Sequence, residues 1–339
     1  MNKQTHRYQF SGPLQLESGK IIRDFPLTYT TLGTLNPKKD NAVWVFHAMT
    51  ANSDPSDWWP GMVGEGKFFD PHYFFIICVN IPGSCYGSVG PTHPHHASGT
   101  PYGKDFPFFT PRDMVKAFDA LRTSLGIDSI YLGIGGSMGG QQLLAWASLK
   151  PQLFQYIVPI ATNAFHSPWG KAFNASQRFC MEYDPTWNSD TEDAGMEGMK
   201  IARSIALISY RHYETYRKTQ SDNDHALEYP RSESYQRYQG EKLANRFHPI
   251  SYYILTKSMD AHDLGRGRES AEQALSIIQS KCLVIGISTD ILYPVSEQEF
   301  IKQHIPQAKL EVIDSLYGHD GFLLENESIT DLLKQFTLS

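Results

Sequence analysis

The chain has 339 residues, of which 41% are hydrophobic and 19% are charged, and its net charge is -6. This composition is that of a globular protein and excludes a disordered or fibrous chain. The mildly acidic balance lacks the electrostatic signature of a nucleic-acid binder or a polybasic membrane anchor. We therefore expect neither nucleic acid nor a membrane among its partners.

Short apolar runs alternate with helical patterns along the first half of the chain. The runs predict strands at residues 42–46, 73–79, 128–134 and 155–161, with helices at 113–125 and 139–149. Strands that alternate with helices indicate a parallel sheet with helices on both faces, and near-continuous apolar strands fit a sheet buried on both sides. The predicted fold class is therefore α/β.

The pattern changes after about residue 165. From 166 to 276 the sequence shows helical stretches, for example 199–210 and 248–260, and no convincing strand. A strand, a helix, a strand and a closing helix then follow at 281–286, 295–304, 308–313 and 329–336. An insertion in a surface connection costs little loop-closure entropy, and one this long must form its own structure. We expect a core of residues 1–165 plus 277–339, interrupted by a helical insert of residues 166–276.

No segment of the sequence predicts export or membrane insertion. The longest apolar run, 73–79, is far shorter than the roughly 18 residues that a membrane-spanning helix needs. The amino end is polar and leads into no apolar stretch, so we expect no signal peptide. Four widely separated cysteines (Cys78, Cys85, Cys180 and Cys282) predict reduced thiols and a cytoplasmic location.

The most informative stretch is Gly-Gly-Ser-Met-Gly-Gly at 135–140, which matches G-x-S-x-G between a predicted strand and a predicted helix. Such a turn presents the serine hydroxyl at the carboxyl end of the sheet, and a side chain at either flanking glycine would collide with its neighbours. The alternative is a plain glycine-rich turn, but no lysine follows, so a phosphate-binding P-loop is excluded. Ser137 is the predicted nucleophile.

A serine nucleophile needs a base, and the base needs an orienting carboxylate. Asp290 follows the strand that ends near Gly286, and His319 follows the strand that ends near Ile313. The carboxyl ends of parallel strands meet at one edge of a sheet, where catalytic groups of such folds gather. We expect Ser137, Asp290 and His319 to form a catalytic triad.

The oxyanion that such a triad creates needs two backbone donors. The N–H of Met138 follows the serine, and the N–H of Met49 lies in the loop after the first predicted core strand. His47 in that loop is either functional or a structural histidine that hydrogen-bonds the loop. The histidines at 93–96 lie in a proline-rich loop and predict no metal site.

Several further short motifs occur in one order along the chain. They are 47–50 (HAMT), 59–64 (WPGMVG), 85–88 (CYGS), 101–103 (PYG), 135–140 (GGSMGG), Ala202 and Arg203 with Tyr210, 238–240 (YQG), 258–260 (SMD) and 318–320 (GHD). With these motifs the chain strongly resembles the homoserine O-acetyltransferase family, a branch of the α/β-hydrolase fold. The resemblance covers nearly the whole length, the insert included.

The resemblance implies an enzyme that moves an acetyl group from acetyl-CoA to the hydroxyl of L-homoserine by a ping-pong mechanism, a step of methionine biosynthesis. It implies no bound cofactor, a triad roofed by the insert as a helical lid, and a homodimer formed through that lid. Carried over to this sequence, Arg203 would hold the homoserine carboxylate and Asp320 its ammonium group, with Tyr210 beside them. A guanidinium suits a carboxylate and an aspartate suits an ammonium.

Other functions remain open from the sequence. The chain departs from the family pattern at 49–54, 82–85 and 88–91, so the donor could be a succinyl group and the acceptor serine. An esterase or deacetylase could use the same triad, because fold does not fix the acceptor. Arg203 would then be a surface salt-bridge residue. A non-catalytic binding protein is disfavoured because Ser137 and His319 are both present.

Overall fold

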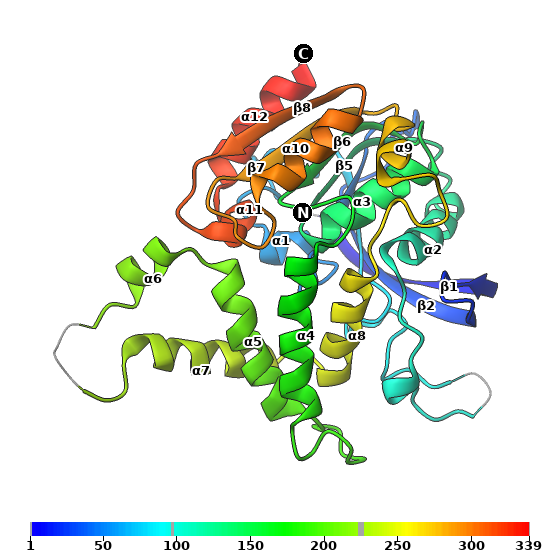
Figure 1. The fold of residues 1–339 in the computed structure, drawn as a ribbon. Helices are drawn as coiled ribbons and strands as arrows, with labels where there is room; N and C mark the ends of the chain where they lie inside the picture. The colour runs from blue at the N-terminus through cyan, green and yellow to red at the C-terminus, as the bar shows by residue number, and fades with distance from the viewer. Residues whose placement is uncertain (1, 96–97, 223–226, 339) are drawn as a thin grey trace.

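A single eight-stranded sheet forms the centre of the computed structural model, which describes residues 2–95, 98–222 and 227–338 (Figure 1). The strand order is β1-β2-β4-β3-β5-β6-β7-β8. The strands are β1 Lys3–Gln15, β2 Ile21–Leu32, β3 Ala42–Phe46, β4 Phe75–Val79, β5 Ile130–Gly136, β6 Phe154–Ile160, β7 Lys281–Ile287 and β8 Ala308–Ile313. Strands β3 to β8 run parallel, and β2 is antiparallel to both of its neighbours.

The predicted α/β class is confirmed, and the predicted core strands all form. The helices are α1 Pro55–Trp58, α2 Pro111–Ser124, α3 Met138–Leu149, α4 Pro168–Glu182, α5 Met196–Tyr210, α6 Tyr213–Thr219, α7 Arg231–Ala244, α8 Pro249–Asp260, α9 Ala271–Ser276, α10 Val295–His304, α11 Gly321–Leu324 and α12 Asn326–Leu338. Two short 3-10 helices, η1 Gly103–Asp105 and η2 Gly318–Asp320, complete the described elements.

The parallel strands are apolar throughout because helices cover both faces of the sheet. In β3, Trp44 and Phe46 belong to the core cluster that contains residues of α2, α3 and α10, whereas Val43 and Val45 belong to the cluster that contains Leu333 of α12. Successive side chains of a strand point to opposite faces, so one five-residue run contributes to two cores.

The segment 166–276 is helical, and its described residues include no strand. Helix α5 packs on α4, α7 and α8, and these helices extend from one end of the sheet, with α6 and α7 reaching outward from the body (Figure 1). Helix α5 contacts η2 and α8 contacts η1, so both join the helical segment to the core. Helix α9 packs instead on α3 and α10, so it lies on the core although it falls within the predicted insert.

The antiparallel hairpin β1–β2 was not expected from the sequence, because the amino end carries no apolar run. Its signal is alternation: in β1 the even-numbered positions 6 to 14 are more buried than their neighbours, and Phe10 stacks on Phe25 of β2 with 4.6 Å between ring centroids. Gly19, at φ +83°, closes the turn between the strands in the left-handed region that glycine tolerates best.

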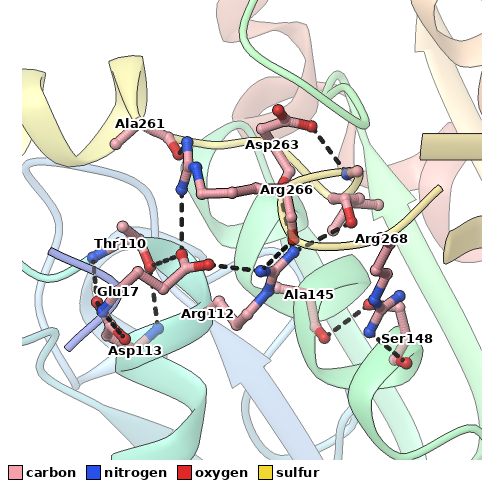
Figure 2. Close-up of polar contacts among 12 residues, drawn as sticks. Glu17, Thr110, Arg112, Asp113, Ala145, Ser148, Ala261, Asp263, Arg266 and Arg268 are labelled. Atoms are coloured by element: carbon pink, nitrogen blue, oxygen red, sulfur yellow. Dashed lines mark hydrogen bonds and ion pairs between the residues drawn. The ribbon is translucent and has the colours of Figure 1, made fainter. Parts of the chain in front are cut away.

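A cluster of charged side chains ties the end of the lid segment to the core (Figure 2). Glu17, which follows β1, accepts hydrogen bonds from Arg112 Nη1 at 2.5 Å and from Arg266 Nη1 at 3.1 Å. Arg112, at the start of α2, also donates to the backbone oxygens of Asp263, Leu264 and Arg266 at 2.8–3.1 Å. The chain that returns from α8 to the core is therefore held by the ion pairs of Glu17 with Arg112 and Arg266 and by the hydrogen bonds of Arg112 to the backbone.

Replacement of Glu17 by glutamine should destabilise the protein by about 2–3 kcal/mol, because it leaves the Arg112 guanidinium, 13% exposed, without its counter-charge. Urea unfolding measures this loss. Glu214→Gln is the matched control, since its pair with Arg217 is exposed to solvent and contributes little to stability. Equal losses in the two variants would contradict the assigned role of Glu17.

Other features of the chain bear on its chemistry. All four cysteines are free, as predicted, and Cys78 and Cys282 are buried. Among the helices of the described residues, none combines the length and apolar composition that a bilayer crossing requires. Within the same residues, no group of three or more His, Cys, Asp or Glu side chains could hold a metal ion. His96, the last histidine of the 93–96 run, lies outside the described residues.

Candidate active site

Ser137 lies at the tight turn between β5 and α3, at the carboxyl end of the sheet. Its backbone is strained, with φ +57° and ψ -127°. A non-glycine residue in such a conformation costs about 1–3 kcal/mol and persists only where its surroundings fix it. Here the Ser137 N–H donates to Ile160 O at 3.0 Å, and Ser137 O accepts from Thr162 Oγ1 at 2.8 Å. The side chain is nearly buried, at 6% exposure.

The glycines of the motif are required by close approach of the backbone. A Cβ on Gly139 would lie 2.2 Å from Phe46 O, and a Cβ on Gly135 would lie 2.6 Å from Gly139 C. Both distances are shorter than any tolerated contact with backbone. The expected collision with the neighbouring strand and helix is therefore confirmed, and it explains why β3, β5 and α3 can meet beneath Ser137.

Asp290 and His319 meet at the same sheet edge, as predicted. His319 Nδ1 lies 2.7 Å from Asp290 Oδ2, and both side chains are buried. The other carboxylate oxygen, Asp290 Oδ1, accepts from the N–H groups of Leu292 at 2.8 Å and Tyr293 at 2.9 Å. These bonds fix the carboxylate, which in turn orients the imidazole so that Nε2 is left to act as a base.

Three aromatic rings surround the His319 imidazole. The ring centroids of Tyr293, Phe322 and Tyr210 lie 5.1, 5.3 and 5.6 Å from that of His319. Tyr210 belongs to lid helix α5, whereas the other two belong to the core. The lid therefore supplies one wall of the site, and the rings limit the access of water to the base.

The two predicted oxyanion donors come from the ends of neighbouring strands. Met138 is the first residue of α3, where a backbone N–H has no partner within the helix. Met49 lies in the loop after β3, and for the described residues neither N–H donates to a protein group. Both residues are buried.

His47 is a structural histidine, the second of the two predicted possibilities. Its Nδ1 lies 2.8 Å from Ala48 O, and its Nε2 accepts from the Ile81 N–H at 3.1 Å. Burial lowers the pKa of His47 to about 4, so the ring is neutral and holds the Met49 loop in place. Arg246 of the lid reaches the same loop, and its Nη1 donates to Thr50 O at 2.5 Å.

The lid places Arg203 against Tyr210, the lid residue that packs on His319. The Arg203 guanidinium carbon lies 5.4 Å from the centroid of the Tyr210 ring, which itself packs on His319. The Arg203 Nε is buried and has no hydrogen-bond partner in the described part of the chain, and no carboxylate there forms an ion pair with this side chain. Arg203 as a whole is partly exposed, but a guanidinium nitrogen that is buried without a partner is unusual for a structural arginine.

Asp320 directly follows His319 in the chain, and its carboxylate already forms an ion pair with Arg211. Its Oδ2 lies 2.8 Å from Arg211 Nε, and its side chain is 16% exposed. Arg211 was not predicted from the sequence. The ion pair joins η2 to the end of α5, and a Cβ on Gly318 would lie 2.9 Å from Tyr210 O, so the His319 loop and the lid are in direct contact.

A buried polar group beside the triad was also not predicted from the sequence. The Tyr293 hydroxyl accepts from Gln141 Nε2 at 3.4 Å, and the same Nε2 donates to Asn163 Oδ1 at 3.0 Å. Burial raises the pKa of neighbouring Glu297 to about 7. No motif points to these residues, and only the position of Tyr293 in the Asp290 loop could have drawn attention to it.

Comparison with known proteins identifies the family. The model of the alpha/beta hydrolase fold matches residues 41–326. A homoserine O-acetyltransferase of Cyclobacterium marinum is 46% identical over 96% of this chain and 93% of its own length. One of Chlorobaculum tepidum is 40% identical over 98% of this chain and 94% of its own length.

The chain belongs to the homoserine O-acetyltransferase family. Solved structures share the fold of this family member, but they include both an acetyltransferase and an esterase and so do not distinguish acetyl transfer from ester hydrolysis. A homoserine O-acetyltransferase of Bacillus anthracis superposes with a TM-score of 0.91 at 21% identity, covering 98% of this chain and 97% of that one. The esterase E22 superposes with a TM-score of 0.90 at 22% identity, covering 98% and 99%.

Three buried histidines of this homoserine O-acetyltransferase family member should make its stability depend steeply on pH. Burial lowers the pKa of His47 and His166 to about 4 and that of His262 to about 3. Below pH 6.5 the unfolded chain protonates these rings while the folded protein does not, so stability falls as pH falls from 6.5 to 4. The raised pKa of Glu297 acts in the opposite direction between pH 4.5 and 7.

The expected net effect is an uptake of about two protons on unfolding, or about 3 kcal/mol lost per pH unit near pH 5. Urea midpoints measured at pH 7, 6 and 5 test this slope. A His262→Gln variant should show a shallower slope than the unmodified protein. Equal midpoints at pH 7 and pH 5 would show that the three rings are not buried in the neutral form.

Proposed function

We propose that this protein transfers an acetyl group from acetyl-CoA to the side-chain hydroxyl of L-homoserine, with Ser137, Asp290 and His319 as its triad. The observation that carries the proposal is Arg203, a guanidinium with a buried, unpartnered Nε that stacks on Tyr210 next to His319. An acceptor with a carboxylate explains that cation, and simple ester hydrolysis does not need it. The names of the relatives at 40–46% identity support the same acceptor.

In the first half-reaction His319 removes the Ser137 proton as Oγ attacks the thioester carbonyl carbon. The Met49 and Met138 N–H groups stabilise the oxyanion of the tetrahedral intermediate. The C–S bond then breaks, the thiol of coenzyme A leaves with the proton held by His319, and acetyl-Ser137 remains. No bound cofactor takes part, because acetyl-CoA is a co-substrate.

In the second half-reaction His319 removes the proton of the homoserine hydroxyl, whose oxygen attacks the acetyl-Ser137 carbonyl. When the intermediate collapses, Ser137 Oγ leaves and regains the proton from His319, and O-acetylhomoserine is released. Arg203 would bind the homoserine carboxylate, and the Asp320 oxygen not paired with Arg211 would bind its ammonium group. This orientation gives the hydroxyl its advantage over water.

The acceptor and the donor are tested together by a thiol-release assay. Acetyl-CoA and succinyl-CoA are each incubated with the enzyme and with homoserine, serine or no acceptor. We expect continuous, multiple-turnover release only with acetyl-CoA and homoserine, and a single burst of at most one thiol per site when acetyl-CoA is given without an acceptor. A dependence on succinyl-CoA or serine would reassign the donor or the acceptor, and continuous release without any acceptor would make the protein a hydrolase.

The esterase alternative is favoured by one observation, the superposition with esterase E22 at a TM-score of 0.90. That likeness concerns the fold, which hosts both activities. An esterase would hydrolyse p-nitrophenyl acetate at a rate unaffected by added homoserine. The transferase should instead release p-nitrophenol faster when homoserine is present, because the amino alcohol intercepts the acetyl-enzyme.

We further propose a homodimer through the lid and a cytoplasmic location. Apolar side chains that are 54–86% exposed lie on lid helices α4, α5 and α7 or next to them: Phe179, Tyr183, Ile201, Ile208 and Tyr238. Exposed apolar groups gathered in this way mark protein interfaces. Sedimentation analysis should give twice the 38.4 kDa mass of the chain. The four free cysteines are those of a protein from a reducing compartment.

A further inference from the structure

The peptide that carries the Met49 N–H is held from its carbonyl side. The Ala48 carbonyl belongs to the same peptide unit, and in a planar trans peptide the C=O and the N–H point in opposite directions. Ala48 O accepts from the Ala51 N–H at 3.0 Å and from His47 Nδ1 at 2.8 Å. These two bonds close a turn over residues 48–51 and direct the Met49 N–H to its other side. In the described part of the chain this N–H donates to no protein group, so it is available to an oxyanion.

A side chain of the lid segment holds the same turn from outside. Arg246, which lies between α7 and α8, donates from Nη1 to Thr50 O at 2.5 Å and to Tyr86 Oη at 2.7 Å. Among the described residues, no other group donates to Thr50 O. Because Thr50 follows β3 and Tyr86 follows β4, the guanidinium joins the lid to two separate loops of the core.

The neighbours of Arg246 fix the place from which its side chain extends. Phe247 is buried, and its ring packs edge-on against the Tyr86 ring with 5.7 Å between centroids. Tyr86 O accepts from Asn80 Nδ2 at 2.7 Å, and Asn80 Oδ1 accepts from the Ser53 N–H at 2.7 Å. Tyr86 and the loop after β3 are therefore one hydrogen-bonded unit of the core, and Arg246 contacts that unit from the lid.

We propose that Arg246 is a positioning residue of the oxyanion hole: by fixing Thr50 O, it keeps the 48–51 turn in the orientation that points the Met49 N–H at the developing oxyanion. Donors of an oxyanion hole are effective because they are already aimed at the position that the charge will occupy. Since Arg246 belongs to the lid, this donor is aligned only while the lid is seated on the core. The inference rests on the proposed triad and oxyanion donors, and it is independent of the acceptor.

The exposure of Arg246 separates this role from a contribution to the fold. The residue is exposed, and substitutions at exposed positions usually change global stability little. Loss of its hydrogen bonds should therefore release the turn while the rest of the chain stays folded. The urea midpoint of an Arg246 variant should match that of the unmodified protein.

The test replaces Arg246 by methionine, which keeps an apolar side chain and removes both donated hydrogen bonds. The burst of p-nitrophenol from p-nitrophenyl acetate, followed by stopped flow at several ester concentrations, gives the acylation rate constant and the dissociation constant of the ester. We expect the rate constant per titrated site to fall about 10-fold, less than the roughly 10²–10³-fold effect of losing a whole oxyanion donor. The dissociation constant should change less than about twofold.

A trifluoromethyl ketone reports on the oxyanion hole directly. Ser137 Oγ adds to its carbonyl carbon while His319 takes the serine proton, and the resulting hemiketal carries its negative charge on the former carbonyl oxygen. The Met49 and Met138 N–H groups would stabilise that oxygen as they stabilise the oxyanion of the reaction. In Arg246→Met the inhibition constant of the ketone should rise by about the factor by which the acylation rate constant falls.

Three further variants serve as comparisons. Arg246→Lys retains a charged donor and should recover part of the lost rate. Tyr86→Phe leaves the bond to Thr50 O intact and should lower the rate constant less than Arg246→Met does. Arg237→Gln is the matched control, because Arg237 is an exposed arginine of α7 that pairs with Glu233, and it should leave all three constants unchanged.

The proposal would be overturned by an acylation rate constant that is unchanged in Arg246→Met. An equal loss in Arg237→Gln would contradict it as well, since the effect would then be that of any lid arginine. A slower acylation with an unchanged inhibition constant of the ketone would show that Arg246 acts elsewhere than on the oxyanion hole. Absence of a burst in the unmodified enzyme would overturn the proposed function and this inference with it, whereas a burst that is insensitive to Arg246 would overturn this inference alone.

Discussion

Replacement of Ser137 by alanine should lower kcat by roughly 10⁴-fold or more, because no other group can form the acyl intermediate. Steady-state assays with acetyl-CoA and homoserine measure the loss, and intact-mass analysis should show that the acetyl adduct of the unmodified enzyme is absent. His319→Ala should produce a loss of similar size. The double variant should be no worse than either single one, since the two residues act in the same step.

The strained turn provides a further readout on the same residue. Alanine at position 137 keeps the φ of +57° unfavourable, whereas glycine relieves it. Ser137→Gly should therefore be inactive but more stable than Ser137→Ala by roughly 1 kcal/mol. A Ser137→Ala variant that kept more than a few per cent of the activity would remove the residue from its role as nucleophile.

The core and the order of the triad could be predicted because each follows from local pattern and one topological rule. A short apolar run such as 42–46 is stable only as a strand buried on both faces. Once several such strands are parallel, their carboxyl ends share one edge. The loops that carry Ser137, Asp290 and His319 must then converge, whatever fills the rest of the chain.

The features that were missed depend on side chains that meet only after folding. The β1–β2 hairpin has an alternating pattern too weak to predict from an isolated polar segment. The Asp320–Arg211 pair joins η2 to the lid, and the Tyr293–Gln141 contact joins the Asp290 loop to α3. Neither pair has a fixed spacing in sequence, because each depends on how the lid and the loops pack.

Replacement of Arg203 by glutamine should raise the KM for homoserine by about 10²-fold or more. A buried charge pair that loses one partner costs about 2–5 kcal/mol in binding. In this site the homoserine carboxylate is the expected partner of the guanidinium that stacks on Tyr210. Arg203→Lys keeps the charge but lacks the planar fork, so its KM should lie between those of the other two enzymes.

The hydrolysis of p-nitrophenyl acetate separates this binding role from a structural one. Ser137 and His319 are untouched in Arg203→Gln, so the rate of acylation by this uncharged ester should stay within about twofold. Arg237→Gln is the control for loss of a lid arginine, because Arg237 is exposed and pairs with Glu233 on the surface of α7. If Arg203→Gln left the homoserine KM unchanged, Arg203 would be structural and the acceptor would have to be recognised by other residues. If it slowed the reaction with the ester as much as with homoserine, Arg203 would act by holding the lid against the His319 loop.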